Sequence, residues 1–88
     1  MIKLSDYVFQ FLQEKGVQYA FMLPGGGAMH LDDSIGRSGI QYICTLHEQA
    51  AAVAAEAYAQ HTNRIGVCLT TSGPGATNAI TGITAGWI

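Results

Sequence analysis

The sequence predicts an α/β fold with three layers (α/β/α), in which helices cover both faces of a parallel sheet. Three short apolar segments, rich in β-branched and aromatic residues, alternate with helix-forming segments. Glycine-rich breaks follow two of these segments, at residues 24–27 and 72–75. Strands that alternate with helices at this spacing need crossover connections, so the strands run parallel and the helices cover the sheet.

Local signals place each expected element along the chain. The expected helices cover residues 5–15, 28–35, 47–60 and 76–88, and the expected strands cover residues 17–23, 40–46 and 65–71. Ser5 is expected to cap the first helix, and Gly16 and Gly36 to end the first two helices. The third helix is rich in Ala, which has the highest intrinsic helix propensity. The third strand is almost continuously apolar, which indicates burial on both faces.

Length and composition suggest part of a larger protein. The chain has 88 residues, so it forms at most one domain, here taken as residues 1–88. Only 11% of its residues are charged, against about 25% in a typical soluble domain. We therefore expect a piece of a larger protein, or a chain that buries one face against a partner, and the apolar finish at Trp87-Ile88 favours a cut chain.

Charge and hydropathy argue against several classes of protein. The net charge is −2 and the four basic residues are scattered, which argues against nucleic-acid binding. No apolar run reaches the roughly 18 residues of a membrane helix, and no signal peptide opens the chain. We expect a cytoplasmic protein. Cys44 and Cys68 are expected to be buried free thiols, with a disulfide or a metal pair as the lesser alternative.

Two glycine-rich turns are candidate ligand sites. In Pro24-Gly25-Gly26-Gly27 the missing side chains allow a ligand to approach the backbone, although neither a dinucleotide motif nor a Walker lysine is present. The run from Ser72 to Asn78 has bare backbone and a proline without an N–H group, which suits a flat ring better than a phosphate. Taken alone, the first turn fits an ordinary strand-to-helix connection better than a ligand site, and the second turn fits both equally.

Glu48 is the candidate catalytic residue. It stands at the start of the Ala-rich helix, where a carboxylate in an apolar site would have a raised pKa and could transfer a proton. Thr45 and Glu48 also match a capping box, in which the glutamate only bonds back to the cap residue. Spacing alone leaves both roles open.

The other polar residues give weaker signals. His30, Asp32 and Asp33 could hold a metal, but such a cluster at a helix start is more typical of solvated surface. Glu56, near the same helix face as Glu48, fits a structural or interface role better than catalysis. No metal-binding residue is therefore assigned.

Together these motifs resemble the thiamine-diphosphate enzymes of the acetolactate synthase and 2-oxo-acid decarboxylase superfamily. The matching runs are Phe21-Met22-Leu23-Pro24-Gly25-Gly26, His47-Glu48-Gln49-Ala50-Ala51, Ala55-Glu56-Ala57-Tyr58-Ala59 and Thr71-Ser72-Gly73-Pro74-Gly75-Ala76-Thr77-Asn78. Each run is weak evidence alone, but all occur in order and span the chain. The resemblance implies the first part of an N-terminal pyrimidine-binding domain.

The resemblance also implies roles for particular residues. Glu48 would hydrogen-bond N1′ of the cofactor's aminopyrimidine and favour its imino form, which removes the C2 proton of the thiazolium ring. The turn from Gly73 would lie near the pyrimidine, and Gly25 to Gly27 would line the reaction side. The expected cofactor-binding residues are Pro24, Gly25, Gly26, Glu48, Gly73, Pro74, Gly75 and Asn78.

Other parts of such a site are expected outside this chain. In the family, a separate domain with a GDG motif binds the diphosphate and Mg²⁺, and the site is completed across a dimer. The resemblance therefore implies a homodimer or homotetramer that shares its site between subunits and acts on a 2-oxo acid. A nucleotide-binding α/β domain without chemistry and an oligomerisation module remain the alternatives.

Overall fold

A three-stranded parallel sheet lies at the centre of the molecule. The computed structural model describes residues 1–87. Strand β1 (Tyr19–Met22) pairs with β2 (Gln41–Cys44) on one side and with β3 (Cys68–Leu69) on the other, so the strand order is β2-β1-β3. Phe21 of β1 lies opposite Ile43 of β2 and Cys68 of β3. The parallel α/β architecture predicted from the sequence is confirmed.

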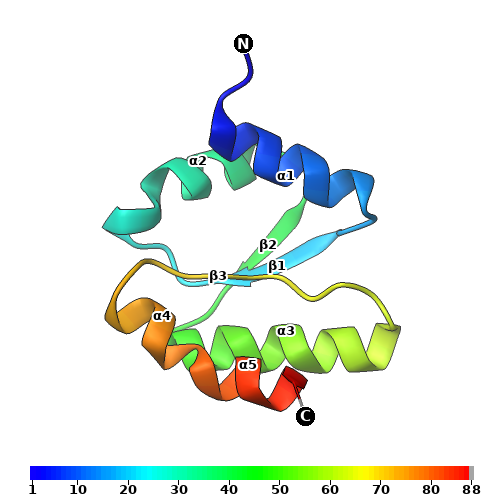
Figure 1. The fold of residues 1–88 in the computed structure, drawn as a ribbon, viewed down its shortest axis with the longest axis vertical. Helices are drawn as coiled ribbons and strands as arrows, with labels where there is room; N and C mark the ends of the chain where they lie inside the picture. The colour runs from blue at the N-terminus through cyan, green and yellow to red at the C-terminus, as the bar shows by residue number, and fades with distance from the viewer. Residues whose placement is uncertain (88) are drawn as a thin grey trace.

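Helices cover both faces of the sheet (Figure 1). One face carries α1 (Leu4–Glu14) and α2 (Met29–Arg37), and the other carries α3 (Glu48–Thr62), α4 (Pro74–Asn78) and α5 (Ile80–Trp87). A short 3₁₀ helix, η1 (Gly26–Ala28), leads from β1 into α2. No helix among residues 1–87 is long and apolar enough to cross a membrane.

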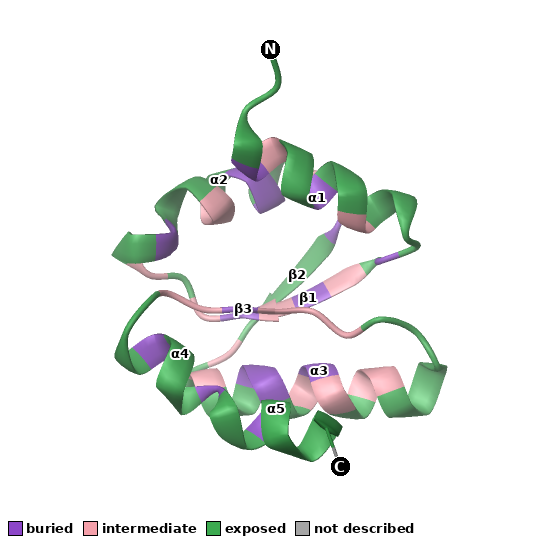
Figure 2. Ribbon diagram, in the orientation of Figure 1, coloured by how far each residue is buried: buried purple, intermediate pink, exposed green. Residues whose placement is uncertain are grey.

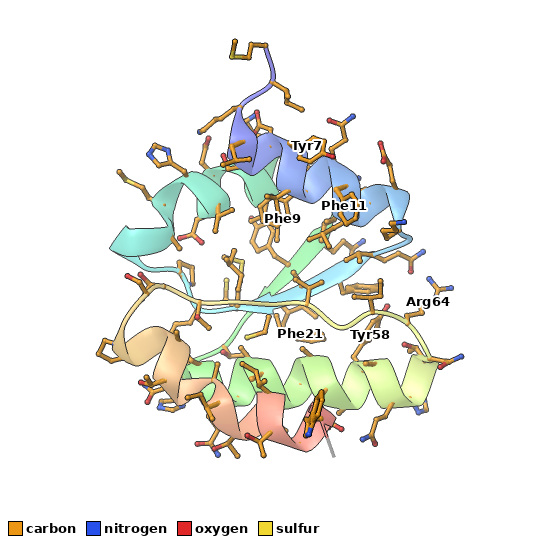
Figure 3. The ribbon with its side chains drawn as sticks, in the orientation of Figure 1. Tyr7, Phe9, Phe11, Phe21, Tyr58 and Arg64 are labelled. Atoms are coloured by element: carbon orange, nitrogen blue, oxygen red, sulfur yellow. The ribbon has the colours of Figure 1, made fainter. Side chains whose placement is uncertain are left out.

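The main apolar core lies between the sheet and the α1–α2 layer. Its buried members are Phe9, Val17, Ala20, Met22, Ile35, Ile40 and Leu69. Figure 3 shows the ring of Phe9 pointing from α1 toward the sheet, and Ile35 of α2 is fully buried beside it. This core fixes α2, and through it the turn at the end of β1.

The opposite layer packs through small residues. Ala51, Ala52 and Ala55 of α3 are buried (Figure 2). Between this helix and the sheet, the rings of Phe21 and Tyr58 lie with their centroids 5.9 Å apart (Figure 3). A Cβ atom at Gly82 of α5 would lie 2.5 Å from the Cβ atom of Ala52, so α5 and α3 pack in close contact at this point. This close packing fixes the start of α3.

The first two helices differ from the predictions at their ends. Helix α1 begins at Leu4, and its N-cap residue Lys3 makes no side-chain capping bond. Ser5 was the expected cap but is buried inside the helix, where its Oγ shares a hydrogen bond with Ser34 Oγ at 2.7 Å. Its hydroxyl serves the contact between α1 and α2. Helix α2 continues through Gly36 to Arg37, so Gly36 does not end it.

The last helix was expected to run unbroken from residue 76 to 88, but it is two helices. Helix α4 starts at Pro74 and ends at Asn78, and Ala79 bonds back to the carbonyl of Ala76 in a tighter turn. The bend directs α5 along α3, where Gly82 meets Ala52. Residue 88 of the expected helix lies outside the described residues.

The strands are shorter and more exposed than expected. Every residue of β2 is exposed, including Cys44, so the expectation of a buried thiol there is wrong. The β3 strand is only half-buried at Cys68, because it pairs on one edge only among residues 1–87. Burial and the nearby Glu48 carboxylate raise the pKa of the Cys68 thiol. Both cysteines are free.

Candidate functional site

The carboxyl ends of all three strands meet at one edge of the sheet. The turn after β1 leads to α2 on one face, whereas the turn after β3 leads to α4 on the other face (Figure 1). Adjacent parallel strands whose connections leave in opposite directions open a crevice between them, and α/β proteins bind ligands there. The two glycine-rich turns lie at this crevice between β1 and β3.

The two glycine turns are in direct contact. A Cβ atom at Gly25 would lie 2.6 Å from the Cβ atom of Thr71, and one at Gly27 would lie 2.6 Å from Thr71 Oγ1. A Cβ atom at Gly27 would also lie 2.9 Å from Ser72 Oγ. Any side chain at either glycine would therefore push the turns apart. Gly26 between them has open space, with no atom within 4 Å of where its Cβ would lie.

Glu48 meets the second turn. Asn78 Nδ2 donates a hydrogen bond to Glu48 Oε1 at 3.2 Å, across 30 residues of sequence. Buried Gly75 lies beside the same carboxylate, since a Cβ atom there would be 3.4 Å from Glu48 Oε2 and 2.8 Å from Thr71 Cγ2. The structure thus brings together Glu48, Gly75 and Asn78, and joins Gly25 to them through Thr71.

The remaining predicted residues lie in the same two turns with their surfaces exposed. Pro24 and Gly26 are exposed in the first turn, and Gly73 and Pro74 in the second. Gly73 has a φ of 69°, a left-handed conformation that favours glycine. Pro74 follows as the first residue of α4.

His47, not Thr45, caps α3. The Nδ1 atom of His47 accepts a hydrogen bond from the backbone N–H of Gln49 at 3.1 Å. Thr45 does not cap the helix. Its N–H group donates to the carbonyl of Met22 in β1, and its Oγ1 donates to the carbonyl of His47. The capping box suggested by Thr45 and Glu48 is therefore not formed, and the Glu48 carboxylate turns to Asn78 instead.

The pKa of Glu48 is shifted in the direction opposite to the one expected. Hydrogen bonding by its own backbone N–H group, and then by Asn78, lowers the pKa of this carboxyl. Burial acts in the opposite direction but is outweighed. The expectation of a raised pKa is thus wrong for this chain, because the helix start offers polar partners that favour the ionised form. At neutral pH the group is an ionised hydrogen-bond acceptor.

Sequence reasoning missed three residues at this site. Thr71 contacts both glycine turns, His47 caps the helix that carries Glu48, and Asp32 holds the first turn. Asp32 was expected on solvated surface, but Oδ2 accepts a hydrogen bond from Gly25 N–H at 3.2 Å and Oδ1 is buried. Its place in the first turn of the second helix, seven residues after Gly25, was the available signal. Within residues 1–87, no three His, Cys, Asp or Glu side chains gather as a metal site.

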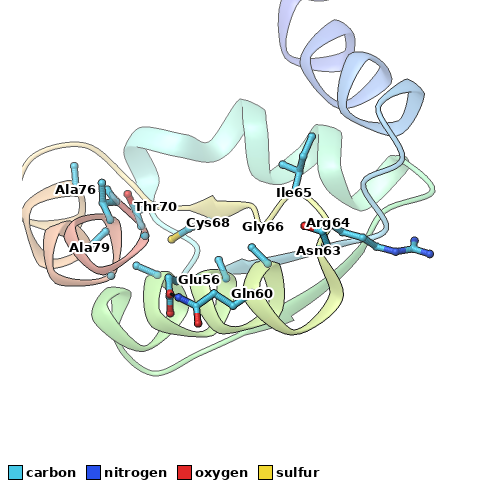
Figure 4. Close-up of a pocket in the computed structure, with 16 residues that line it drawn as sticks. Glu56, Gln60, Asn63, Arg64, Ile65, Gly66, Cys68, Thr70, Ala76 and Ala79 are labelled. Atoms are coloured by element: carbon cyan, nitrogen blue, oxygen red, sulfur yellow. Dashed lines mark hydrogen bonds between the residues drawn. The ribbon is translucent and has the colours of Figure 1, made fainter. Parts of the chain in front are cut away.

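A separate groove of about 780 Å³ runs between α3, β3 and α5 (Figure 4). Small residues line most of it, with Glu56, Gln60 and Arg64 among the polar ones. Gln60 Nε2 donates a hydrogen bond to Glu56 Oε1 there. Ala76 of the second turn lines the groove, whereas Glu48 and the first glycine turn do not, so the groove adjoins the candidate site without including Glu48.

Comparison with known proteins gives the family. A family model described as "Thiamine pyrophosphate enzyme, N-terminal TPP binding domain" matches residues 2–87. This chain belongs to that family. The matched residues 2–87 include both glycine turns and Glu48.

Several relatives of this TPP-binding domain are acetolactate synthases. The large subunit of the Haemophilus influenzae enzyme is 50% identical over 86 residues, which cover 94% of this chain and 15% of that protein. The Lactococcus lactis large subunit is 50% identical over 80 residues, or 90% of this chain and 14% of that protein. The large subunit of Escherichia coli isozyme 2 is 44% identical over 79 residues, again 90% and 14%. The chain thus spans about 15% of the length of these relatives.

Proposed function

We propose that this chain forms the aminopyrimidine-binding half of a thiamine pyrophosphate site in a longer enzyme that acts on 2-oxo acids. The observation that carries the proposal is the hydrogen bond by which Asn78 holds the Glu48 carboxylate beside Gly75, at the crevice between β1 and β3. The family match and the acetolactate synthase relatives support the same assignment.

The residues at the crevice suit an aminopyrimidine ring. Gly73 and Pro74 are exposed and present backbone without large side chains, whereas buried Gly75 packs against Thr71 and the Glu48 carboxylate. A flat ring can therefore approach this backbone closely. Pro24, Gly25 and Gly26 would line the opposite side, toward the reacting centre.

Glu48 would act on the cofactor and not directly on the substrate. Thiamine pyrophosphate supplies the carbanion chemistry by which 2-oxo acids lose carbon dioxide. Glu48, ionised by its partners, would accept a hydrogen bond from the protonated ring nitrogen N1′ and hold the proton there. Asn78 would keep the carboxylate oriented, because it occupies Oε1 and leaves Oε2 toward Gly75.

The rest of the site would come from outside residues 1–88. We propose that a second domain binds the diphosphate through Mg²⁺ and that the site is shared between subunits of a cytoplasmic homodimer or homotetramer. Exposed apolar side chains in several parts of the chain, among them Ile43, Ile65, Ile83 and Trp87, are compatible with such contacts. Acetolactate formation from 2-oxo acids is the reaction that the relatives' names favour.

Calorimetric titration of the longer protein tests the proposal. Thiamine pyrophosphate with Mg²⁺ is expected to bind, and the Glu48→Ala variant is expected to lose roughly tenfold or more in affinity. Adenine nucleotides are expected not to bind. Binding of adenine nucleotides without thiamine pyrophosphate would support a nucleotide-binding domain and contradict the proposal. No ligand binding, together with self-association in sedimentation, would support the oligomerisation module instead.

A further inference from the structure

Asp32 lies under the glycine turn at the end of β1. Its Oδ2 atom accepts a hydrogen bond from the backbone N–H of Gly25 at 3.2 Å. Its Oδ1 atom is buried and has no hydrogen-bond partner among residues 1–87. We propose that Asp32 is a positioning residue, which holds the Gly25–Gly27 turn where the reaction needs it; this inference rests on the proposed function.

The burial of the Oδ1 atom of Asp32, a residue that is otherwise half-buried, needs an explanation. A carboxylate oxygen that leaves water without a new partner destabilises the folded chain. The neighbouring Asp33 avoids this cost, because it is exposed and pairs with Arg37 and Lys3. Asp32 makes one side-chain hydrogen bond, which it accepts from Gly25 N–H, and its Oδ1 atom is buried without a partner among residues 1–87.

Two hydrogen bonds hold Gly25, one at its N–H group and one at its carbonyl. The first is the bond to Asp32. The Gly25 carbonyl accepts a hydrogen bond from Ala28 N–H at 3.0 Å, and Ala28 is buried. Gly25 is therefore held by both of its backbone polar groups. Because it has no side chain, these two bonds determine where its backbone lies.

The position of Gly25 is transmitted to Glu48 by direct contacts. Gly25 and Gly27 both pack closely against Thr71. Thr71 in turn packs against Gly75, which lies beside the Glu48 carboxylate. Closely packed groups of this kind cannot shift independently. A turn released from Asp32 would move away from the cofactor, or would let Thr71 and Gly75 move relative to Glu48.

A purely structural role for Asp32 makes a different prediction. An acid in the first turn of a helix stabilises that helix through its dipole, and an exposed carboxylate there serves equally well. Such a role would alter the thermal stability of the protein and leave turnover unchanged. Positioning instead predicts a loss in kcat that exceeds the change in cofactor affinity.

The test compares Asp32→Leu, Asp32→Asn and the control Asp33→Asn in the longer protein. Asp32→Leu is expected to lower kcat at least about tenfold, and to weaken thiamine pyrophosphate binding by a clearly smaller factor. Asp32→Asn is expected to retain kcat within about threefold, because its amide oxygen can accept from Gly25 N–H. Asp33→Asn is expected to leave kcat unchanged. In cofactor-free protein, the Gly25 amide is expected to exchange its hydrogen faster in Asp32→Leu than in the wild type. Asp32→Asn and Asp33→Asn are expected to exchange at the wild-type rate.

Several results would overturn the inference. Unchanged kcat in Asp32→Leu, or equal losses in Asp32→Asn and Asp32→Leu, would leave Asp32 without a positioning role. If Asp32→Leu does not fold, Asp32→Ser replaces it, since its hydroxyl is too short to reach Gly25, and the same readouts apply. Wild-type protein that does not bind thiamine pyrophosphate would contradict the proposed function, whereas hydrogen exchange would still report on the Asp32 anchor.

Discussion

At the scale of single residues, the Glu48 carboxylate depends on its own backbone N–H group and on one partner that is distant in sequence. Its carboxylate is held by Asn78, 30 residues further along the chain. The pattern of motifs predicted that Glu48 and the second glycine turn belong together. It could not predict the lowered pKa, because that shift depends on hydrogen bonds which exist only after folding.

Gly75 is the residue at which the packing of the site can be tested with one methyl group. In Gly75→Ala the new Cβ atom would lie 2.8 Å from Thr71 Cγ2 and 3.4 Å from Glu48 Oε2. We expect at least about tenfold weaker binding of thiamine pyrophosphate by calorimetry, since the carboxylate or the turn must move. The control is Gly36→Ala in α2, where the added Cβ atom meets nothing within 4 Å. Equal affinity in both variants would contradict the described geometry.

At the scale of elements, the contact between α3 and α5 depends on Gly82. A Cβ atom there would lie 2.5 Å from the backbone carbon of Ala52, which cannot yield as a flexible side chain would. We expect Gly82→Ala to destabilise the protein by about 1–3 kcal/mol in thermal or denaturant unfolding.

Gly86 of the same helix provides the matched control. Its added Cβ atom would make an ordinary contact at 3.5 Å with Glu56 Cγ. Gly86→Ala is therefore expected to be neutral or to stabilise by up to about 1 kcal/mol, through helix propensity. If Gly82→Ala behaved like Gly86→Ala, the close packing of α3 on α5 would be wrong.

The existence of the elements could be predicted from the sequence, but several of their ends could not. Ser5 has the chemistry of a cap but bonds to Ser34 of α2, and Thr45 is held in place by the carbonyl of Met22. The break at Ala79 arises because α5 must turn to meet α3. In each case a tertiary contact overrides a local preference, and local signals contain no information on such contacts.

At the scale of the whole molecule, an ionic cluster ties α1 to α2. Arg37 Nη2 lies 2.7 Å from Asp6 Oδ1 and 3.0 Å from Asp33 Oδ2. The hydrogen bonds and charge of Arg37 lower the pKa of both carboxyls, and these groups raise the pKa of Arg37. Because the folded pKa of each aspartate lies below its unfolded value, the stabilisation is complete above about pH 4 and is lost as the pH falls further.

The variant Arg37→Gln should reveal this pH dependence. We expect its Tm to be lower than that of the wild type by no more than about 2 °C at pH 7, since the groups are exposed. The difference should shrink below about pH 4 and in high salt. Arg64→Gln, which removes a cation from the groove side, serves as the control and should show no such pH dependence. A difference that persists in acid would contradict the ionic account.

The overall architecture was predictable because it follows from the alternation of strand and helix segments. Parallel strands place the turns after residues 22, 44 and 69 at one edge of the sheet, whatever the details of packing. The contact of Gly25 and Gly27 with Thr71 was not predictable, because it depends on the strand order β2-β1-β3. The same holds for the hydrogen bond between Gly25 N–H and Asp32, which forms only once α2 packs beside the turn.

The central claim is that Glu48 activates thiamine pyrophosphate by binding its aminopyrimidine. The most direct test is the rate of hydrogen–deuterium exchange at C2 of the bound cofactor, followed by NMR in the longer protein and its Glu48→Gln variant. Gln keeps the size of the side chain but removes the charge, so we expect exchange to slow by about two orders of magnitude or more while the variant remains folded. Exchange at the wild-type rate in a folded, cofactor-bound Glu48→Gln variant would contradict the claim.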